Sequence, residues 1–228
     1  MRNAMRLATI PIALLALAGP ARADQIPIFS TGVDASGAPL SGGSADPHWS
    51  VFAGPDITSP APAEVLISPN GLYAGSAESK WIWVHADGSG STGSPYTFRL
   101  TFDLTGLNPS TATISGAWGV DNEGVIRLNG AAPTGTGALT LTNFDDLGNF
   151  DVLNRFSITG GFVAGVNTLD FLATDNDNPG ALNVSTLIGT AAAGAVPEPV
   201  SFLLIGTGAI AVSGYARRRR VKAPANRA

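Results

Sequence analysis

The most regular alternation of apolar and polar side chains runs from Tyr96 to Leu104. Every even-numbered position in this stretch is aromatic or aliphatic, whereas the odd-numbered positions are threonine, arginine or aspartate. Because the side chains of a strand point alternately to its two faces, this period of two predicts a strand with one buried face. Weaker alternation predicts further strands at four later places, which are 114–120, 126–128, 169–173 and 182–188.

Turn-forming residues separate these apolar segments, at 108–110, 121–124, 129–130 and 178–180. Ser30–Ala63 is looser and rich in glycine, proline and serine, so we expect extended loops there with a short strand at Trp49–Ala53. Ala191–Val196 has the composition of a small-residue linker. Between the two ends of the chain, no apolar period of 3.6 is sustained. The sequence therefore predicts an all-β domain, an antiparallel β-sandwich or jelly roll.

The first residues of the chain have the order of a secretory signal peptide. Arg2 and Arg6 form a positive start, Leu7–Ala18 is apolar, and Ala21-Arg22-Ala23 matches a cleavage site with small residues at its first and third positions. We expect residues 1–23 to form a signal helix that is removed after Ala23.

The last residues have three parts in fixed order. Pro197-Glu198-Pro199 is a rigid, charged motif, and the uncharged apolar run 200–216 follows it. About 17 apolar residues are the lower limit for a helix that crosses a bilayer, so we expect a single transmembrane helix at 200–216. The four arginines that follow should hold that end of the helix in the cytoplasm; they are Arg217, Arg218, Arg219 and Arg220.

This three-part order resembles the PEP-CTERM sorting signal of Gram-negative bacteria. The resemblance implies that an exosortase, a membrane transpeptidase-like enzyme, recognises and cuts the chain at or near 197–199. The protein would then pass from an inner-membrane-anchored precursor to the cell surface or the extracellular space. The alternative is a plain membrane anchor in which Pro-Glu-Pro is only a stiff linker. The chain thus divides into a signal peptide at 1–23, a β-sandwich domain at 24–195 and a sorting signal at 196–228.

Charge is distributed unevenly between the domain and the two ends. Of the thirteen basic residues, only four lie in the domain, against sixteen acidic ones there, which leaves a net charge near −12. A surface of this sign does not favour binding to nucleic acid. The chain has no cysteine, so disulfides, cysteine-ligated metals and thiol catalysis are excluded.

Five stretches of the domain are distinctive: Asp46–Trp49, Lys80–Trp83, Tyr96–Gly106, Trp118–Gly130 and Gly165–Phe171. On these residues the domain resembles the ectodomains of one set of PEP-CTERM proteins and the galactose-binding-like β-sandwich domains. The resemblance implies a jelly roll and a role in carbohydrate binding. Such folds host many functions, so the fold alone does not settle the function.

Sugar binding requires an aromatic platform beside polar groups that fix hydroxyls. The candidate platform residues are Trp49, Trp81 and Trp83. The candidate polar rim consists of Asp121, Asn122, Glu123 and Asn129. The alternative is that the tryptophans belong to the core and that the polar residues only form turns.

Asp175-Asn-Asp177-Asn-Pro-Gly180 partly copies a calcium loop, with oxygen-bearing side chains at alternate positions. It lacks the glutamate of an EF-hand, so we expect at most a structural Ca²⁺ at Asp175 and Asp177, or else a plain turn. No other cofactor is expected.

The sequence contains no recognisable catalytic motif. Only two histidines are present, His48 and His85, and no Gly-x-Ser-x-Gly sequence accompanies them. Neighbouring carboxylates such as Asp145 and Asp146 lie in segments that favour solvated turns, although a glycosidase would need such a pair across a cleft. The sequence therefore predicts an exported, non-enzymatic envelope or matrix protein, associated with exopolysaccharide or biofilm through carbohydrate binding. The alternative is a purely structural or adhesive protein; a glycosidase is the least supported.

Overall fold

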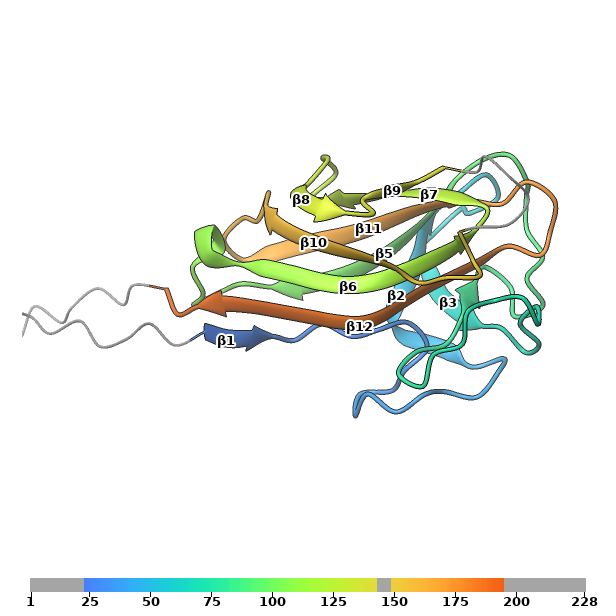
Figure 1. Ribbon diagram of the computed structural model, residues 1–228, viewed down its shortest axis with the longest axis horizontal. Coiled ribbons are helices and arrows are strands. Elements are labelled where there is room, and N and C mark those ends of the chain that lie inside the picture. The colour runs from blue at the N-terminus through green and yellow to red at the C-terminus, as the bar shows by residue number, and fades with distance from the viewer. Residues whose placement is uncertain (1–22, 143–148, 195–228) are drawn as a thin grey trace, which may run out of the picture. The chain divides into compact units, whose positions relative to one another are not determined.

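A computed structural model describes residues 23–142 and 149–194, which form an antiparallel, all-β domain (Figure 1). Its sheet has the strand order β8-β10-β6-β12-β4-β3-β2-β5-β11-β7-β9, and β1 pairs with β12. The all-β, antiparallel class predicted from the sequence is confirmed. The strands are β1 Ala23–Ile26, β2 Ala45–Ala53, β3 Ala61–Val65, β4 Ile82–Trp83, β5 Tyr96–Asp103, β6 Thr113–Asp121, β7 Glu123–Leu128, β8 Thr134–Gly137, β9 Thr140–Leu141, β10 Asn154–Gly160, β11 Val166–Thr174 and β12 Ala181–Ala192.

The predicted signal peptide up to residue 22 and the predicted sorting signal, with its helix at 200–216, lie outside the described residues. Residues 23–142 and 149–194 contain no helix long and apolar enough to cross a membrane. Their only helical segment is a single 3₁₀ turn, Pro109–Thr111.

The strand predicted from the Tyr96–Leu104 alternation is β5, and its even-numbered side chains are buried as expected. β5 lies between β2 and β11, with Phe98 opposite Phe171 and Leu100 opposite Leu169 in the ladder with β11. Residues directly opposite each other in an antiparallel pair contribute to sheet stability through their side-chain contacts. The buried, apolar positions of β5 therefore lie opposite buried, apolar positions of β11.

The sheet curls so that two layers face each other across an aromatic core (Figure 1). Phe171 of β11 meets Trp118 of β6 with ring centroids 5.0 Å apart, and Phe156 of β10 at 5.9 Å. Trp49 of β2 lies 5.6 Å from the same ring. All three contacts are edge-on, the geometry that aromatic quadrupoles favour. Phe171 is thus the point at which the two layers interlock.

Three expectations about local structure need correction. β2 begins at Ala45, earlier than the strand expected at Trp49–Ala53, and β3 arises inside the segment expected to be loop. β12 continues to Ala192, so it includes the first residues of the expected linker. In each case backbone pairing with a neighbouring strand outweighs a composition that favours loops.

The chain enters and leaves the sheet at one corner. β1 pairs with the end of β12, with Ala23 opposite Ala192 and Ile26 opposite Gly189 (Figure 1). The turn predicted at Asn129-Gly130 is also present: both residues have positive φ, 53° and 78°, and Leu128 bridges to Ala131.

Candidate functional site

All four tryptophans are buried. Trp49, Trp81, Trp83 and Trp118 are 1%, 4%, 0% and 0% exposed. Three of their indole N–H groups donate to backbone carbonyls: Trp49 to Phe29 at 3.0 Å, Trp81 to Ala74 at 3.0 Å, and Trp118 to Ala138 at 2.7 Å. An exposed aromatic platform is therefore not formed by these side chains, and their placement favours the core role that the sequence offered as the alternative.

Trp81 and Trp83 have different neighbours. Trp83 packs against Tyr96 and Phe98 in the core. Trp81 packs against Tyr73, with ring centroids 4.7 Å apart, and both of these side chains line a hollow of about 170 Å³. Of the predicted platform residues, Trp81 therefore borders a cavity.

The predicted polar rim divides between the two ends of β7. Asp121, Asn122 and Glu123 lie where β6 turns into β7, whereas Asn129 follows the far end of β7. There, Asn129 donates through Nδ2 to Asn167 at 2.9 Å and accepts from the backbone N–H of Thr168 at 3.0 Å. Asn129 is therefore a turn-stabilising residue, apart from the other three.

The β6–β7 turn meets the loop in which a calcium site was predicted. Asn122 Oδ1 accepts from the backbone N–H of Asn176 at 2.7 Å, and its carbonyl accepts from Asn149 Nδ2 at 2.7 Å. Asp175 is fully buried and accepts from the backbone N–H groups of Asp177 and Asn178 at 3.2 and 2.9 Å. The structure thus brings the predicted rim and the predicted calcium loop together.

The calcium loop has the hydrogen bonds of an Asx-stabilised turn. Within the described residues, no three acidic or histidine side chains converge in a metal-binding arrangement. Burial raises the pKa of Asp175, while its bonds to backbone N–H groups act in the opposite direction. The plain turn is the arrangement that these contacts favour, and Ca²⁺ binding by Asp175 and Asp177 stays a prediction.

A buried Asp–Tyr contact lies beside this loop. The Tyr73 hydroxyl is 2.7 Å from the Asp121 carboxylate and 2.8 Å from the carbonyl of Pro179. Burial is the main cause that raises the pKa of Asp121 to about 6; the carboxylates of Asp175 and Asp177 add to it, and the Tyr73 hydrogen bond opposes it. Burial and Asp121 together raise the pKa of Tyr73 far above its ordinary value. No sequence pattern predicts this contact, because Tyr73 lies in a loop segment without apolar alternation.

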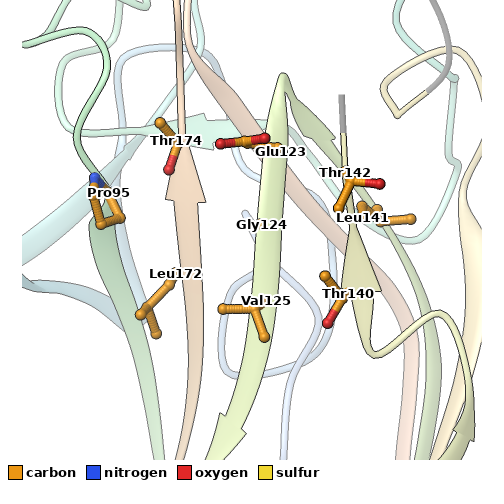
Figure 2. A pocket seen from close by; sticks show the side chains of 9 residues that line it. All are labelled: Pro95, Glu123, Gly124, Val125, Thr140, Leu141, Thr142, Leu172 and Thr174. Carbon is orange, nitrogen blue, oxygen red and sulfur yellow. The ribbon is translucent and has the colours of Figure 1, made fainter. Parts of the chain in front are cut away.

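Glu123 borders a shallow groove of about 260 Å³ on the outer face of β11, β7 and β9 (Figure 2). Leu172 and Val125 lie opposite each other in the β11–β7 ladder and form its apolar part, with Thr140 opposite Val125 on β9. Figure 2 shows Glu123 near Thr174 at one end of the groove. An apolar strip edged by hydroxyl and carboxylate groups offers a contact surface, without an enclosed site.

The two histidines lie on different segments, His48 in β2 and His85 two residues beyond β4. His48 stacks on Phe29 with ring centroids 3.7 Å apart and an interplanar angle of 3°. The His85 side chain is exposed. Asp145 and Asp146 lie outside the described residues.

Comparison of the chain with protein-family models, with curated proteins and with solved structures finds no match. The class that the fold defines is an antiparallel β domain with its four tryptophans in the core. The resemblances to PEP-CTERM proteins and to galactose-binding-like domains stay predictions.

Proposed function

We propose that this chain is an exported cell-envelope protein, sorted by an exosortase, whose β domain is a non-enzymatic building block of the extracellular matrix. The precursor is held in the inner membrane by residues 200–216, and the mature domain is displayed on or released from the surface of a Gram-negative cell. In that setting the domain associates with exopolysaccharide. This proposal refines the fold to a β-sandwich or jelly roll of the galactose-binding-like kind.

The proposed sorting rests on the order of three sequence features: Pro197-Glu198-Pro199, the apolar run and the arginines 217–220. The observation that favours a building block is the burial of all four tryptophans, because a tryptophan platform for polysaccharide would need an exposed indole. A net charge near −12 in the domain also suits a soluble, extracellular component.

The address is tested in a host that carries an exosortase, by comparing the chain with a variant in which Pro197, Glu198 and Pro199 are alanine. We expect the wild-type chain to lose its C-terminal segment and the variant to stay in the membrane fraction as the uncut precursor. Intact-mass measurement of the surface and membrane fractions identifies both ends of each product. The same experiment gives the N-terminus, which we expect at Asp24.

A Pro60→Ala variant is the matched control, since Pro60 is an exposed proline in a loop of the domain. It should be processed as the wild type is. Identical processing of the triple variant and the wild type would refute the sorting proposal and support a plain anchor. Loss of processing in a strain without the exosortase would identify the enzyme responsible.

The structural role is tested by deleting the gene and measuring the matrix. We expect a weaker biofilm with unchanged polysaccharide composition, because a building block changes assembly without changing chemistry. A shortened or accumulated polysaccharide would instead indicate a glycosidase and overturn the non-enzymatic part of the proposal.

A further inference from the structure

The hollow next to Trp81 lies between the 66–81 segment and β12. Tyr73 and Trp81 supply two aromatic rings to its lining, and Ser76, Ser79 and Asn183 supply polar groups. The exposed Lys80 is also part of its lining. Aromatic surface and hydrogen-bonding groups therefore converge on one cavity, the combination expected of a site for a small polar molecule.

Asn183 is the residue of this hollow that the fold alone does not explain. It is fully buried on β12, and its Oδ1 accepts a hydrogen bond from the Ser79 hydroxyl at 2.7 Å. Its Nδ2 is buried as well, but within the described residues it has no acceptor. A buried amide N–H without an acceptor destabilises the fold, and a water or a ligand in the hollow that accepts from it removes that cost.

The rest of the lining is held in place by its own hydrogen bonds. Ser76 and Ser185 share a hydrogen bond of 2.8 Å, and Trp81 is fixed by its bond to Ala74. The backbone N–H of Ala74 donates to the carbonyl of Phe150 at 2.7 Å. The walls are thus preorganised, which lowers the entropic cost of binding.

The size of the hollow limits the ligand. At about 170 Å³, it holds about five water molecules, and it is smaller than the roughly 300 Å³ at which drug-sized sites begin. A molecule of this size needs an acceptor for Asn183 Nδ2, hydroxyls for the serines and an apolar face for the rings. A single sugar ring has all three.

We propose that this hollow binds one sugar ring, either a free monosaccharide or the terminal unit of a glycan, through Asn183, the adjacent serines and the Tyr73–Trp81 pair. The choice of a sugar over other small polar molecules rests on the proposed association with exopolysaccharide. The site itself rests on the hollow and on the unpaired amide.

The test is calorimetric titration of the full-length chain, in a zwitterionic detergent that contains no sugar headgroup. The probes are glucose, galactose, mannose, N-acetylglucosamine and glucuronate. We expect saturable binding of at least one of them, weakened about tenfold by Asn183→Ala, the loss of one hydrogen bond. If glucuronate is the tightest ligand, Lys80→Ala should weaken it and leave the neutral sugars unchanged.

A second variant keeps the test decisive if Asn183→Ala fails to fold. Gly75 also lines the hollow, and a Cβ added to it meets no atom within 4 Å, so Gly75→Phe should fold and obstruct the site. Gly71 is equally unobstructed in the same loop but does not line the hollow, which makes Gly71→Phe the matched control. We expect binding to be lost in Gly75→Phe and kept in Gly71→Phe.

No saturable binding to any of the five probes would overturn the proposal, as would binding that both Asn183→Ala and Gly75→Phe leave unchanged. Export and processing do not depend on this hollow. The Asn183→Ala chain should therefore be sorted as the wild type is, so the failure of the sugar site and the failure of the sorting proposal give different results.

Discussion

Replacement of Asp121 by asparagine should stabilise the domain at neutral pH. Asp121 is 7% exposed and accepts the hydroxyl of Tyr73 at 2.7 Å. Burial and the nearby carboxylates of Asp175 and Asp177 raise its pKa from 3.8 to about 6. Asparagine keeps an oxygen that accepts the hydrogen bond from the Tyr73 hydroxyl, but its side chain carries no charge. It therefore stands in for the protonated, neutral form of Asp121 at every pH.

The direction of the pH dependence follows from the two pKa values. The folded chain holds the Asp121 proton more tightly than the unfolded chain does. Its contribution to the free energy of unfolding is therefore fully present below about pH 4 and is lost as the pH rises through about 6. The rise in the pKa of Asp121 from 3.8 to about 6 corresponds to at most about 3 kcal/mol of unfolding free energy. Solvent screening near the loop reduces this contribution to about 1–2 kcal/mol. The Asp121→Asn variant should exceed the wild type by that amount at neutral pH and match it near pH 4.

Urea unfolding of residues 24–196, followed by tryptophan fluorescence at a series of pH values, measures this difference. Subtracting the wild type from the variant removes the contribution of Asp46, whose pKa burial also raises and which is not among the groups that shift the pKa of Asp121. Asp151→Asn, at an exposed position, is the control. A difference that stays constant between acid and neutral pH, or a variant that is less stable at neutral pH, would refute the reasoning.

Three further substitutions test the core and the outer face by chemical unfolding. Phe171→Ala removes the ring on which three aromatic side chains converge and should cost about 3–5 kcal/mol; a loss below about 1 kcal/mol would contradict the packing. Gly180→Ala places a Cβ inside a buried indole ring and should lower the melting temperature, whereas Gly71→Ala, at an open position, should not. Arg99→Met removes a two-point ion pair with the buried Asp170, at 2.7 and 2.8 Å, and should destabilise the domain by about 3 kcal/mol, because it leaves that carboxylate without its partner.

The fold class was predictable because period-two alternation depends only on the neighbouring residues of one strand. β5 shows this, since its buried positions coincide with its apolar ones. β3 was harder to predict, because the alternation in Ala-Pro-Ala-Glu-Val is short, rests mostly on alanine and includes a proline, and the segment forms a strand through its partners β2 and β4. Its pairing is a property of the assembled sheet.

The candidate site was less predictable than the fold, for a related reason. Whether a tryptophan belongs to a platform or to the core depends on side chains far away in sequence, and Trp49 meets Phe171. Asn183 belongs to an apolar, alternating segment that gives no sign of a polar cavity. Its unpaired amide appears only once Ser79, 104 residues earlier, lies against it.

The pairing of β1 with the end of β12 places the first and last strand residues of the domain at the same end of the sheet. Ala23 and Ala192 lie opposite each other at one end of the sheet, whereas Asn183 and the Tyr73 loop lie toward the other. Nine residue steps along a strand, from Asn183 to Ala192, span about 30 Å. In a domain held by its C-terminal end, the hollow would therefore lie up to that distance along the sheet from the last residue of β12.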